Sequence, residues 1–304
     1  MDGIINLYKP RGYTSHDAVA RMKRFCGTRR VGHAGTLDPM AEGVLPILVG
    51  RAAGAQEYLM NHDKRYLAGM RFGTVTDTGD ITGNTVSCRK VCLDCAQVAE
   101  AAEKFVGKIS QVPPMYSALK IGGKKLYELA RDGITVERKA REIEIYSAEV
   151  LNGGGTDFLV RVCCSKGTYI RTLCEDIGAA LGCGGALYSL VREACGEFDI
   201  SDAVTVDEIE RIYTSGGAAE VEKLLISPEK VFSGLCAVKL SEFFSRLCKN
   251  GCEIYLKKAG LREGDFSVGQ TVRLYDSQGA FFAVGKIGIY GGGMAVKASV
   301  RFAD

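Results

Sequence analysis

The chain has 304 residues, of which 46% are hydrophobic and 25% charged, and its formal net charge is +3. This composition is ordinary for a folded globular protein and excludes long disordered tracts. No apolar run approaches the roughly 20 residues that span a membrane, and the N-terminus lacks a signal-peptide pattern. The length predicts one large domain and one small domain, and the expected location is the cytoplasm.

The twelve cysteines predict reduced, mostly buried thiols, because a chain of this length does not need disulfides for stability. Cys92 and Cys95 form a lone C-x-x-C pair, and the histidines at 16, 33 and 62 offer no second ligand pair at zinc spacing. We therefore expect no bound metal. A metalloenzyme built on the cysteines is an alternative, and it predicts that a chelator removes activity.

Positive charge gathers at the two ends of the sequence. Residues 1–32 hold seven Lys or Arg against two Asp or Glu, and residues 239–304 hold ten against six. Two basic ends around an acidic middle suit a polyanion held at two places, although dispersed surface lysines give the same counts.

The first 72 residues predict short strands separated by helices, from apolar alternation and capping residues. The predicted elements are a strand over 1–8, a helix capped by Thr14 or Ser15, a strand over 44–49 interrupted by Pro46, a helix over 56–60 and a strand over 66–72.

Between the first helix and the buried strand lies the octet Gly32-His33-Ala34-Gly35-Thr36-Leu37-Asp38-Pro39. Its glycines and proline are too irregular for a helix or a central strand, which places Asp38 on a loop. The plain interpretation is a turn aspartate that accepts hydrogen bonds from nearby amides. A histidine, a threonine and an acid within six residues, beside glycines that allow close backbone approach, favour a functional loop.

The middle of the chain predicts both element types. The predicted elements are helices over 96–105 and 126–131, an extended segment over 111–120, and strands over 143–150 and 158–164 joined by a glycine turn. The most regular helix follows, with an apolar stripe formed by Ile170, Leu173, Cys174, Ile177 and Leu181. Arg171 lies in the first turn of this helix.

The pattern changes in the last third of the chain. Short alternating segments over 272–275, 281–284 and 295–300 predict a small barrel or sandwich. We place a boundary near residue 237, which divides the chain into domains of residues 1–237 and 238–304.

Cofactor motifs are missing from the sequence. Lys166-Gly167-Thr168 lacks the order and spacing of a phosphate loop, and no G-x-G-x-x-G occurs. We expect neither a nucleotide nor a redox cofactor.

The octet around Asp38 resembles the signature of the TruB family of tRNA pseudouridine synthases, and further matches follow in the family's order. The resemblance implies that the protein isomerises uridine 55 in the T loop of tRNA by flipping out the base, without a cofactor. It also implies an α+β fold: a pseudouridine synthase core with a mixed, largely antiparallel sheet flanked by helices, then a small all-β PUA-like barrel that binds RNA. The other matching positions are Lys9, Pro10, Gly12 and Ser15, which look structural, and the segments 76–80 and 116–120.

Three catalytic residues follow from the resemblance. Asp38 matches the catalytic aspartate, Arg171 matches the arginine that pairs with it, and Tyr66 matches the active-site tyrosine whose ring would lie against the base. Pairing with a guanidinium would keep a buried carboxylate ionised. Attack on the base, attack on the sugar and proton removal around a glycal-type intermediate stay open as its role. By themselves, a helix-terminal arginine and a core tyrosine are the plain interpretations.

Substrate-binding residues follow in the same way. His33 matches the residue that occupies the space left by the flipped base, and Tyr169 and Leu190 match pocket-lining positions. Lys64 and Lys120 are expected to contact phosphate. The plain alternatives are a loop hydrogen bond for the histidine and core packing for the leucine.

Two related functions stay open. One is that of the guide-RNA-directed relative of archaea and eukaryotes, which needs protein partners. The other is a catalytically silent RNA-binding or tRNA-folding protein that uses the same surface. Matches of the bacterial type favour a stand-alone enzyme, a monomer that acts on tRNA without an obligatory protein partner.

Overall fold

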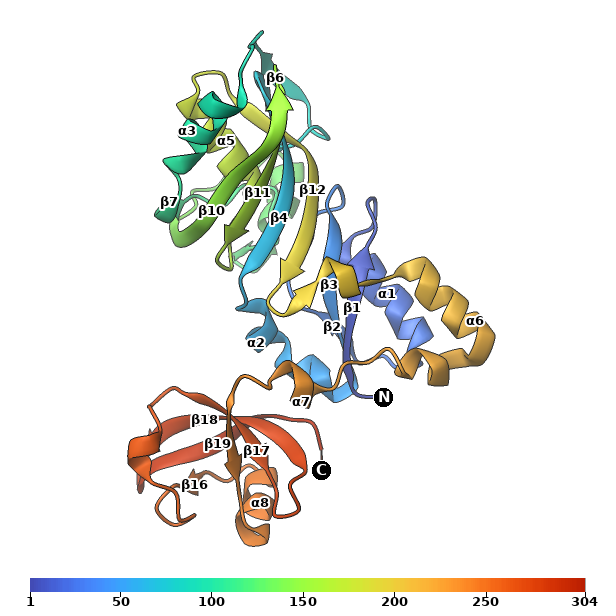
Figure 1. Ribbon diagram of the computed structural model, residues 1–304, viewed down its shortest axis with the longest axis vertical. Coiled ribbons are helices and arrows are strands. Elements are labelled where there is room, and N and C mark those ends of the chain that lie inside the picture. The colour runs from blue at the N-terminus through green and yellow to red at the C-terminus, as the bar shows by residue number, and fades with distance from the viewer. Residues whose placement is uncertain (304) are drawn as a thin grey trace.

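The computed structural model describes residues 1–303. A ten-stranded mixed sheet forms the larger part of the molecule, and a five-stranded sheet that begins at Cys236 forms the smaller part (Figure 1). The division falls within two residues of the boundary expected near residue 237, and the domain limits themselves stay a prediction.

The large sheet is mixed and mostly antiparallel, as expected. β1 pairs with β14, and β3 with β12, in parallel, while the other neighbours run antiparallel. The order is β14 (Val204–Thr205), β1 (Gly3–Lys9), β3 (Glu42–Val49), β12 (Gly185–Cys195), β4 (Lys64–Phe72), β11 (Asp157–Cys164), β10 (Arg141–Gly154) and β7 (Gly107–Gln111), with β2 (Val31–His33) on β3 and β13 (Phe198–Asp199) on β12.

Helices flank this sheet. α3 (Cys95–Glu103) and α5 (Ile170–Ala180) pack near β10 and β12, and α1 (Ser15–Phe25) packs against α6 (Val206–Glu222) beside β1 (Figure 1). Thr14 is the cap of α1, since its side chain accepts from the Asp17 amide. The apolar stripe of α5 is confirmed, because Ile170, Leu173, Cys174 and Ile177 are buried.

β3 differs from the expected interrupted strand. It runs unbroken through Pro46, which pairs with Asn6 of β1 and accepts a hydrogen bond from Ala34 at 2.9 Å. The proline therefore contributes its carbonyl to the sheet where β2 has ended, so its missing N–H does not break the strand.

β12 lies at the centre of the sheet and was not predicted. Buried Arg192 and half-buried Glu193 interrupt its apolar pattern. The periodicity of apolar residues therefore does not indicate a strand here. The strand nevertheless pairs along its length with β4.

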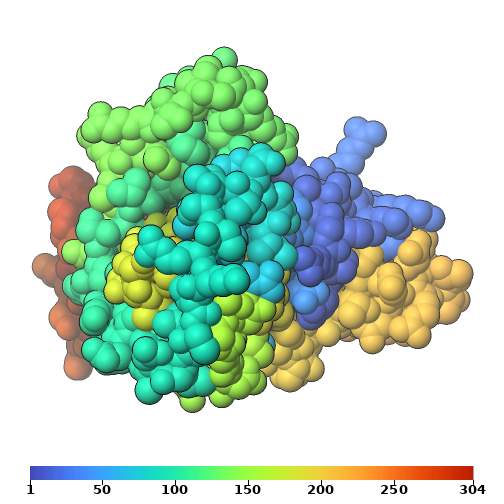
Figure 2. Space-filling model, turned by 90° about the horizontal axis from the view of Figure 1, so that it is seen from above, coloured from blue at the N-terminus to red at the C-terminus, as the bar shows by residue number. Residues whose placement is uncertain are grey.

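Smaller elements lie outside the two large sheets. They are the hairpin of β5 (Thr74–Thr76) and β6 (Thr85–Cys88), the hairpin of β8 (Lys120–Ile121) and β9 (Lys124–Lys125), and α4 (Leu126–Arg131), as expected over 126–131. In Figure 2 the green segment forms the upper edge of the molecule, and the blue N-terminal segment lies to its right.

The smaller part is a curled sheet with one helix. Its order is β15 (Cys236–Lys239), β17 (Thr271–Tyr275), β18 (Phe281–Tyr290), β19 (Gly293–Arg301) and β16 (Ile254–Tyr255), accompanied by α8 (Glu242–Lys249) and a 3-10 turn, η3 (Glu263–Asp265). The linking elements of the chain are η1 (Gly50–Ala55), α2 (Gln56–Met60), η2 (Ile200–Asp202) and α7 (Pro228–Val231).

Aromatic rings join the two parts. Phe302 of the small part lies 6.0 Å from the ring of Phe232 and stacks on Phe281 at 5.4 Å. Phe232 in turn meets Tyr58 edge-on at 6.0 Å. The two sheets therefore share a hydrophobic cluster at their junction.

All twelve cysteines are free, as expected, but only five are buried, so the expectation of mostly buried thiols is wrong. The exposed cysteines lie on the β6 hairpin, its following loop and the small part of the chain. Across residues 1–303, no helix is long and apolar enough to cross a membrane.

Candidate active site

Asp38 lies on the loop between β2 and β3, and hydrogen bonds from other segments of the chain hold this loop. The Ser15 hydroxyl, at the start of α1, accepts from the Leu37 amide at 2.9 Å and donates to the Leu37 carbonyl at 3.2 Å. The Gly12 amide donates to the Pro39 carbonyl at 2.7 Å. The first residue of α1 and the turn before it therefore support the loop.

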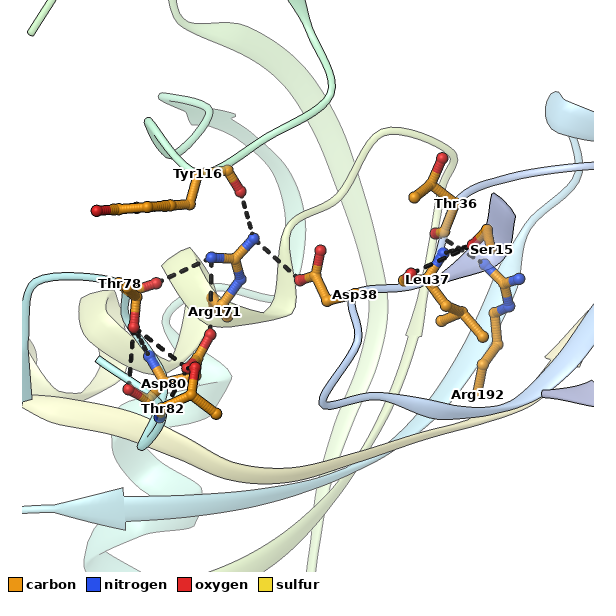
Figure 3. A network of polar contacts seen from close by, with 10 residues as sticks. All are labelled: Ser15, Thr36, Leu37, Asp38, Thr78, Asp80, Thr82, Tyr116, Arg171 and Arg192. Carbon is orange, nitrogen blue, oxygen red and sulfur yellow. Dashed lines mark hydrogen bonds and ion pairs between the residues drawn. The ribbon is translucent and has the colours of Figure 1, made fainter. Parts of the chain in front are cut away.

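Arg192 of β12 holds the same loop from the other side. Arg192 is 1% exposed, and its guanidinium donates to the carbonyls of Val44 at 2.6 Å, Gly35 at 3.1 Å and Thr36 at 3.5 Å. Figure 3 shows it beneath Thr36, beside the loop. These acceptors lie on both arms of the loop, so one side chain fixes its width.

Asp38 forms an ion pair with Arg171 in the first turn of α5, as the resemblance implied. Arg171 Nη2 lies 2.9 Å from Asp38 Oδ2, and the arginine also donates to the carbonyls of Thr78 at 2.9 Å and Tyr116 at 2.6 Å (Figure 3). Its side chain is only 6% exposed, whereas that of Asp38 is 37% exposed. The arginine is thus a fixed, buried support for an accessible carboxylate.

A second carboxylate stands behind Arg171. Asp80 Oδ2 lies 3.8 Å from Arg171 Nη1, and its other oxygen accepts from the Thr82 amide at 2.9 Å and from the Thr82 hydroxyl. The sequence placed Asp80 only within a matching segment, without a role. Its pairing with the guanidinium brings two acids to one arginine.

The groups around Asp38 shift its pKa in opposite directions. Burial in the cleft and the neighbouring charge of Asp80 raise the pKa of Asp38 above its ordinary value, while Arg171 and Lys9 oppose the rise. About a third of the side chain is open to solvent, so the carboxylate is accessible from the cavity.

A cavity of about 850 Å³ opens above this pair. Its walls come from the Asp38 loop, the start of α1, the turn at Asp80, the segment at Tyr116 and the β9–α4 region. A cavity of this size suits a flipped nucleotide and the chain on either side of it.

Tyr66 and Leu190 lie in the central strands β4 and β12 of the large sheet, outside the set of residues that line the cavity. Tyr66 of β4 pairs with Arg192 of β12, is 8% exposed, and contacts the guanidinium through its hydroxyl. Burial raises the pKa of Tyr66 to about 12, so its phenol is protonated at neutral pH. Leu190 is 7% exposed and pairs with Ala68.

Tyr169 lies at the start of α5, and His33 lies at the end of β2, where the Asp38 loop begins. Tyr169 is the cap residue of α5, where Gln111 accepts from its amide at 2.8 Å, and burial raises its pKa. His33 ends β2 and meets His16, a residue of the cavity wall, at 6.1 Å between ring centroids. Burial lowers the pKa of His33 to about 4, so this ring is neutral at physiological pH.

The two predicted phosphate lysines differ in their surroundings. Lys64 is 8% exposed, and its ammonium donates to the carbonyls of Met60 at 2.8 Å and of His62. Lys64 is the first residue of β4, and these internal contacts of its ammonium argue against a phosphate contact. Lys120 is exposed on the β8–β9 hairpin beside the cavity.

Metal ligands are not gathered anywhere in the described part of the chain. Across residues 1–303 no group of three or more His, Cys, Asp or Glu side chains could hold a metal ion.

Comparisons with known proteins agree with this fold and site. A family described as "TruB family pseudouridylate synthase (N terminal domain)" matches residues 23–170, and "tRNA pseudouridylate synthase B C-terminal domain" matches residues 171–232. A solved Cbf5-Nop10-Gar1 complex contains a chain that is 27% identical, with a TM-score of 0.76, covering 99% of this chain and 84% of that one. Fold and site together define a pseudouridylate synthase.

Sequence relatives narrow the class further. The tRNA pseudouridine synthase B of Clostridium kluyveri is 43% identical over 254 residues, which cover 84% of this chain and 86% of the relative. That of Clostridium acetobutylicum is 38% identical over 287 residues, 94% of this chain and 96% of the relative. The chain belongs to the TruB family.

Proposed function

We propose that this protein isomerises uridine 55 in the T loop of tRNA to pseudouridine, with Asp38 as the catalytic group. The observation that carries the proposal is a partly exposed carboxylate held at 2.9 Å by a buried arginine at the floor of a cavity of about 850 Å³. Relatives named tRNA pseudouridine synthase B, matched over most of their length, support tRNA as the substrate.

The reaction needs little more than a positioned anion. The bond from ribose C1′ to N1 breaks, a bond from C1′ to C5 forms, the C5 proton leaves and N1 gains one, so no group is added. An ionised Asp38 can act as a nucleophile or stabilise an electron-deficient sugar. Arg171 directs this carboxylate, and the neutral ring of His33 is suited to fill the stack that the flipped base leaves.

The stand-alone mode is part of the proposal. A chain in the Cbf5-Nop10-Gar1 complex shares the fold, so a guide-directed enzyme is the nearest rival. The more similar relatives are named for tRNA, which favours direct action on tRNA by a monomer in the cytoplasm, without an obligatory protein partner, cofactor or metal.

The test is the formation of pseudouridine in unmodified tRNA by the purified protein, followed by mapping of the modified position. We expect modification at uridine 55, unaffected by chelator. Asp38→Asn should bind the same tRNA with unchanged affinity and form no product, because the amide keeps the shape and loses the charge. An active Asp38→Asn protein, or product that depends on added guide RNA, contradicts the proposal.

A further inference from the structure

Two histidine rings meet where α1 packs beside β2, at the edge of the Asp38 loop. His16 is the second residue of α1 and lines the cavity, whereas His33, the last residue of β2, is not among the residues that line it. The ring centroids lie 6.1 Å apart and the ring planes differ by 75°, which is the edge-on arrangement that aromatic pairs favour. His16 is therefore the histidine that faces the cavity, and its ring contacts that of His33.

Hydrogen bonds around the start of α1 fix the backbone of His16. The Asp17 amide donates to the Thr14 hydroxyl at 3.1 Å, and the Thr14 amide donates to the Asp17 carboxylate at 2.9 Å. Between them, the Ser15 hydroxyl accepts from the Leu37 amide at 2.9 Å. The side chain of His16 takes no part in these hydrogen bonds and is exposed, so its replacement should leave the start of the helix intact.

The ring of His33 is held differently from its backbone. The backbone pairs with Ile47 of β3, but the buried Nδ1 of the ring has no hydrogen-bond partner within residues 1–303. Burial, with smaller contributions from the charges of His16 and Arg192, lowers the pKa of His33 to about 4, so the ring is neutral and no ion pair orients it. The orientation of this ring therefore depends on packing, and the ring of His16 contributes to that packing.

We propose that His16 is a positioning residue for base flipping, and that its edge-on ring keeps the ring of His33 in the orientation that fills the space left by the flipped uridine. The inference rests on the proposed function, because that space exists only when a base leaves the RNA stack. A flat ring stabilises such a gap by stacking on the bases beside it, which requires a defined ring plane. His16 thus acts through His33, without contact to the reacting atoms.

Base flipping in an RNA hairpin with the T stem and loop tests this role. A 2-aminopurine next to uridine 55 becomes more fluorescent when that uridine leaves the stack, so saturating full-length protein reports the flipped fraction. We expect His16→Ala to reduce the equilibrium constant for flipping by about two- to tenfold, the contribution of an edge-on aromatic pair, and to slow single-turnover formation of pseudouridine with it. His16→Phe keeps a ring at this position and should retain most of the wild-type flipping. His62→Gln, at a half-buried histidine outside the cavity lining, is the matched control and should flip like the wild type.

A double-mutant cycle separates action through His33 from a direct effect of His16 on the RNA. In a His33→Ala background the ring that His16 positions is gone, so adding His16→Ala should cause little further loss of flipping. Thermal melts confirm that each variant is folded, and we expect His16→Ala to melt like the wild type because this side chain is exposed.

The outcomes separate the two proposals. A wild-type protein that makes pseudouridine, together with a His16→Ala variant that flips the base like the His62→Gln control, overturns the role of His16 alone. Losses that simply add in the His16→Ala/His33→Ala double variant also overturn it, because they show that His16 does not act through His33. A wild type that flips uridine 55 with the expected dependence on His16 but makes no pseudouridine overturns the proposed function alone.

Discussion

At the scale of single residues, the site depends on one carboxylate whose surroundings are almost all fixed. Arg171 is buried and donates to two carbonyls besides Asp38, so it cannot follow a displaced aspartate. The position of Asp38 must then come from its own loop, which Ser15, Gly12 and Arg192 hold through backbone atoms. Activity should therefore respond to residues that never touch the substrate.

Arg192→Lys tests this dependence. A lysine keeps the charge but cannot reach three carbonyls at once, and a misplacement of about 1 Å can cost roughly a hundredfold in rate. We expect the single-turnover rate to fall by about that factor while the affinity for tRNA changes less than about twofold. Arg161→Lys, a change at a half-exposed arginine of the same sheet that pairs with Glu193, is the control. A wild-type rate in Arg192→Lys contradicts a positioning role.

The pH dependence of the reaction tests the charge of Asp38. Since burial and Asp80 raise its pKa, activity should be lost, as pH falls, at a pH above the ordinary aspartate pKa. Asp80→Asn removes a neighbouring negative charge, so the acid midpoint of the single-turnover rate should move to lower pH even if the maximum rate drops.

His33→Gln is the control for that profile, because His33 has a pKa of about 4 and also titrates in acid. Its midpoint should stay with the wild type. If His33→Gln moves the midpoint and Asp80→Asn does not, the acid limb belongs to the histidine.

At the scale of elements, the loop is placed by the close approach of β3 and β12. Gly43 pairs with Arg192 in parallel and has φ +103°, and a Cβ at this position would lie 2.3 Å from the Arg192 carbonyl oxygen. Glycine is needed at Gly43 for both its backbone angle and the contact. The close pairing of Gly43 with Arg192 therefore fixes the point at which the Asp38 loop enters β3.

Gly43→Ala should destabilise the protein by about 2 kcal/mol or more and reduce activity, because strain and overlap add. Urea unfolding and single-turnover rates measure the two effects. Gly133→Ala has a similar positive φ of 71° but nothing near its Cβ, so it should cost about 1 kcal/mol and leave activity intact. Equal losses in the two variants refute the close-approach argument.

At the scale of the whole molecule, an aromatic junction couples the two sheets. Phe302 is 9% exposed and comes from the end of the chain, yet it packs with Phe232 and with residues of the larger part in one cluster. Cooperative unfolding of the two parts should depend on this cluster.

Phe302→Ala should lower the free energy of unfolding by about 3 kcal/mol and separate the unfolding of the two parts into distinct transitions. Urea unfolding, followed by circular dichroism, measures both. Phe243→Ala, at a phenylalanine of α8 that is 55% exposed, should change little. A single transition in Phe302→Ala with wild-type midpoint argues against coupling through this cluster.

Local sequence patterns determined much of this protein. Apolar periodicity predicted α5, the capping residue predicted the start of α1, and the glycines and proline of the octet placed Asp38 on a loop, because these signals act within a few residues. The resemblance carried by the octet also predicted the pairing of Asp38 with Arg171.

Only the tertiary structure decided the rest. The contact of Asp80 with Arg171 and the contacts of Arg192 with the Asp38 loop join segments far apart in the chain. Likewise, β12 was hidden because a buried arginine breaks its apolar pattern, and Lys64 proved to be buried at the start of β4. The spacing of apolar residues indicates which face of a helix or strand is buried. The partner of a polar side chain depends instead on which strands lie side by side in the fold.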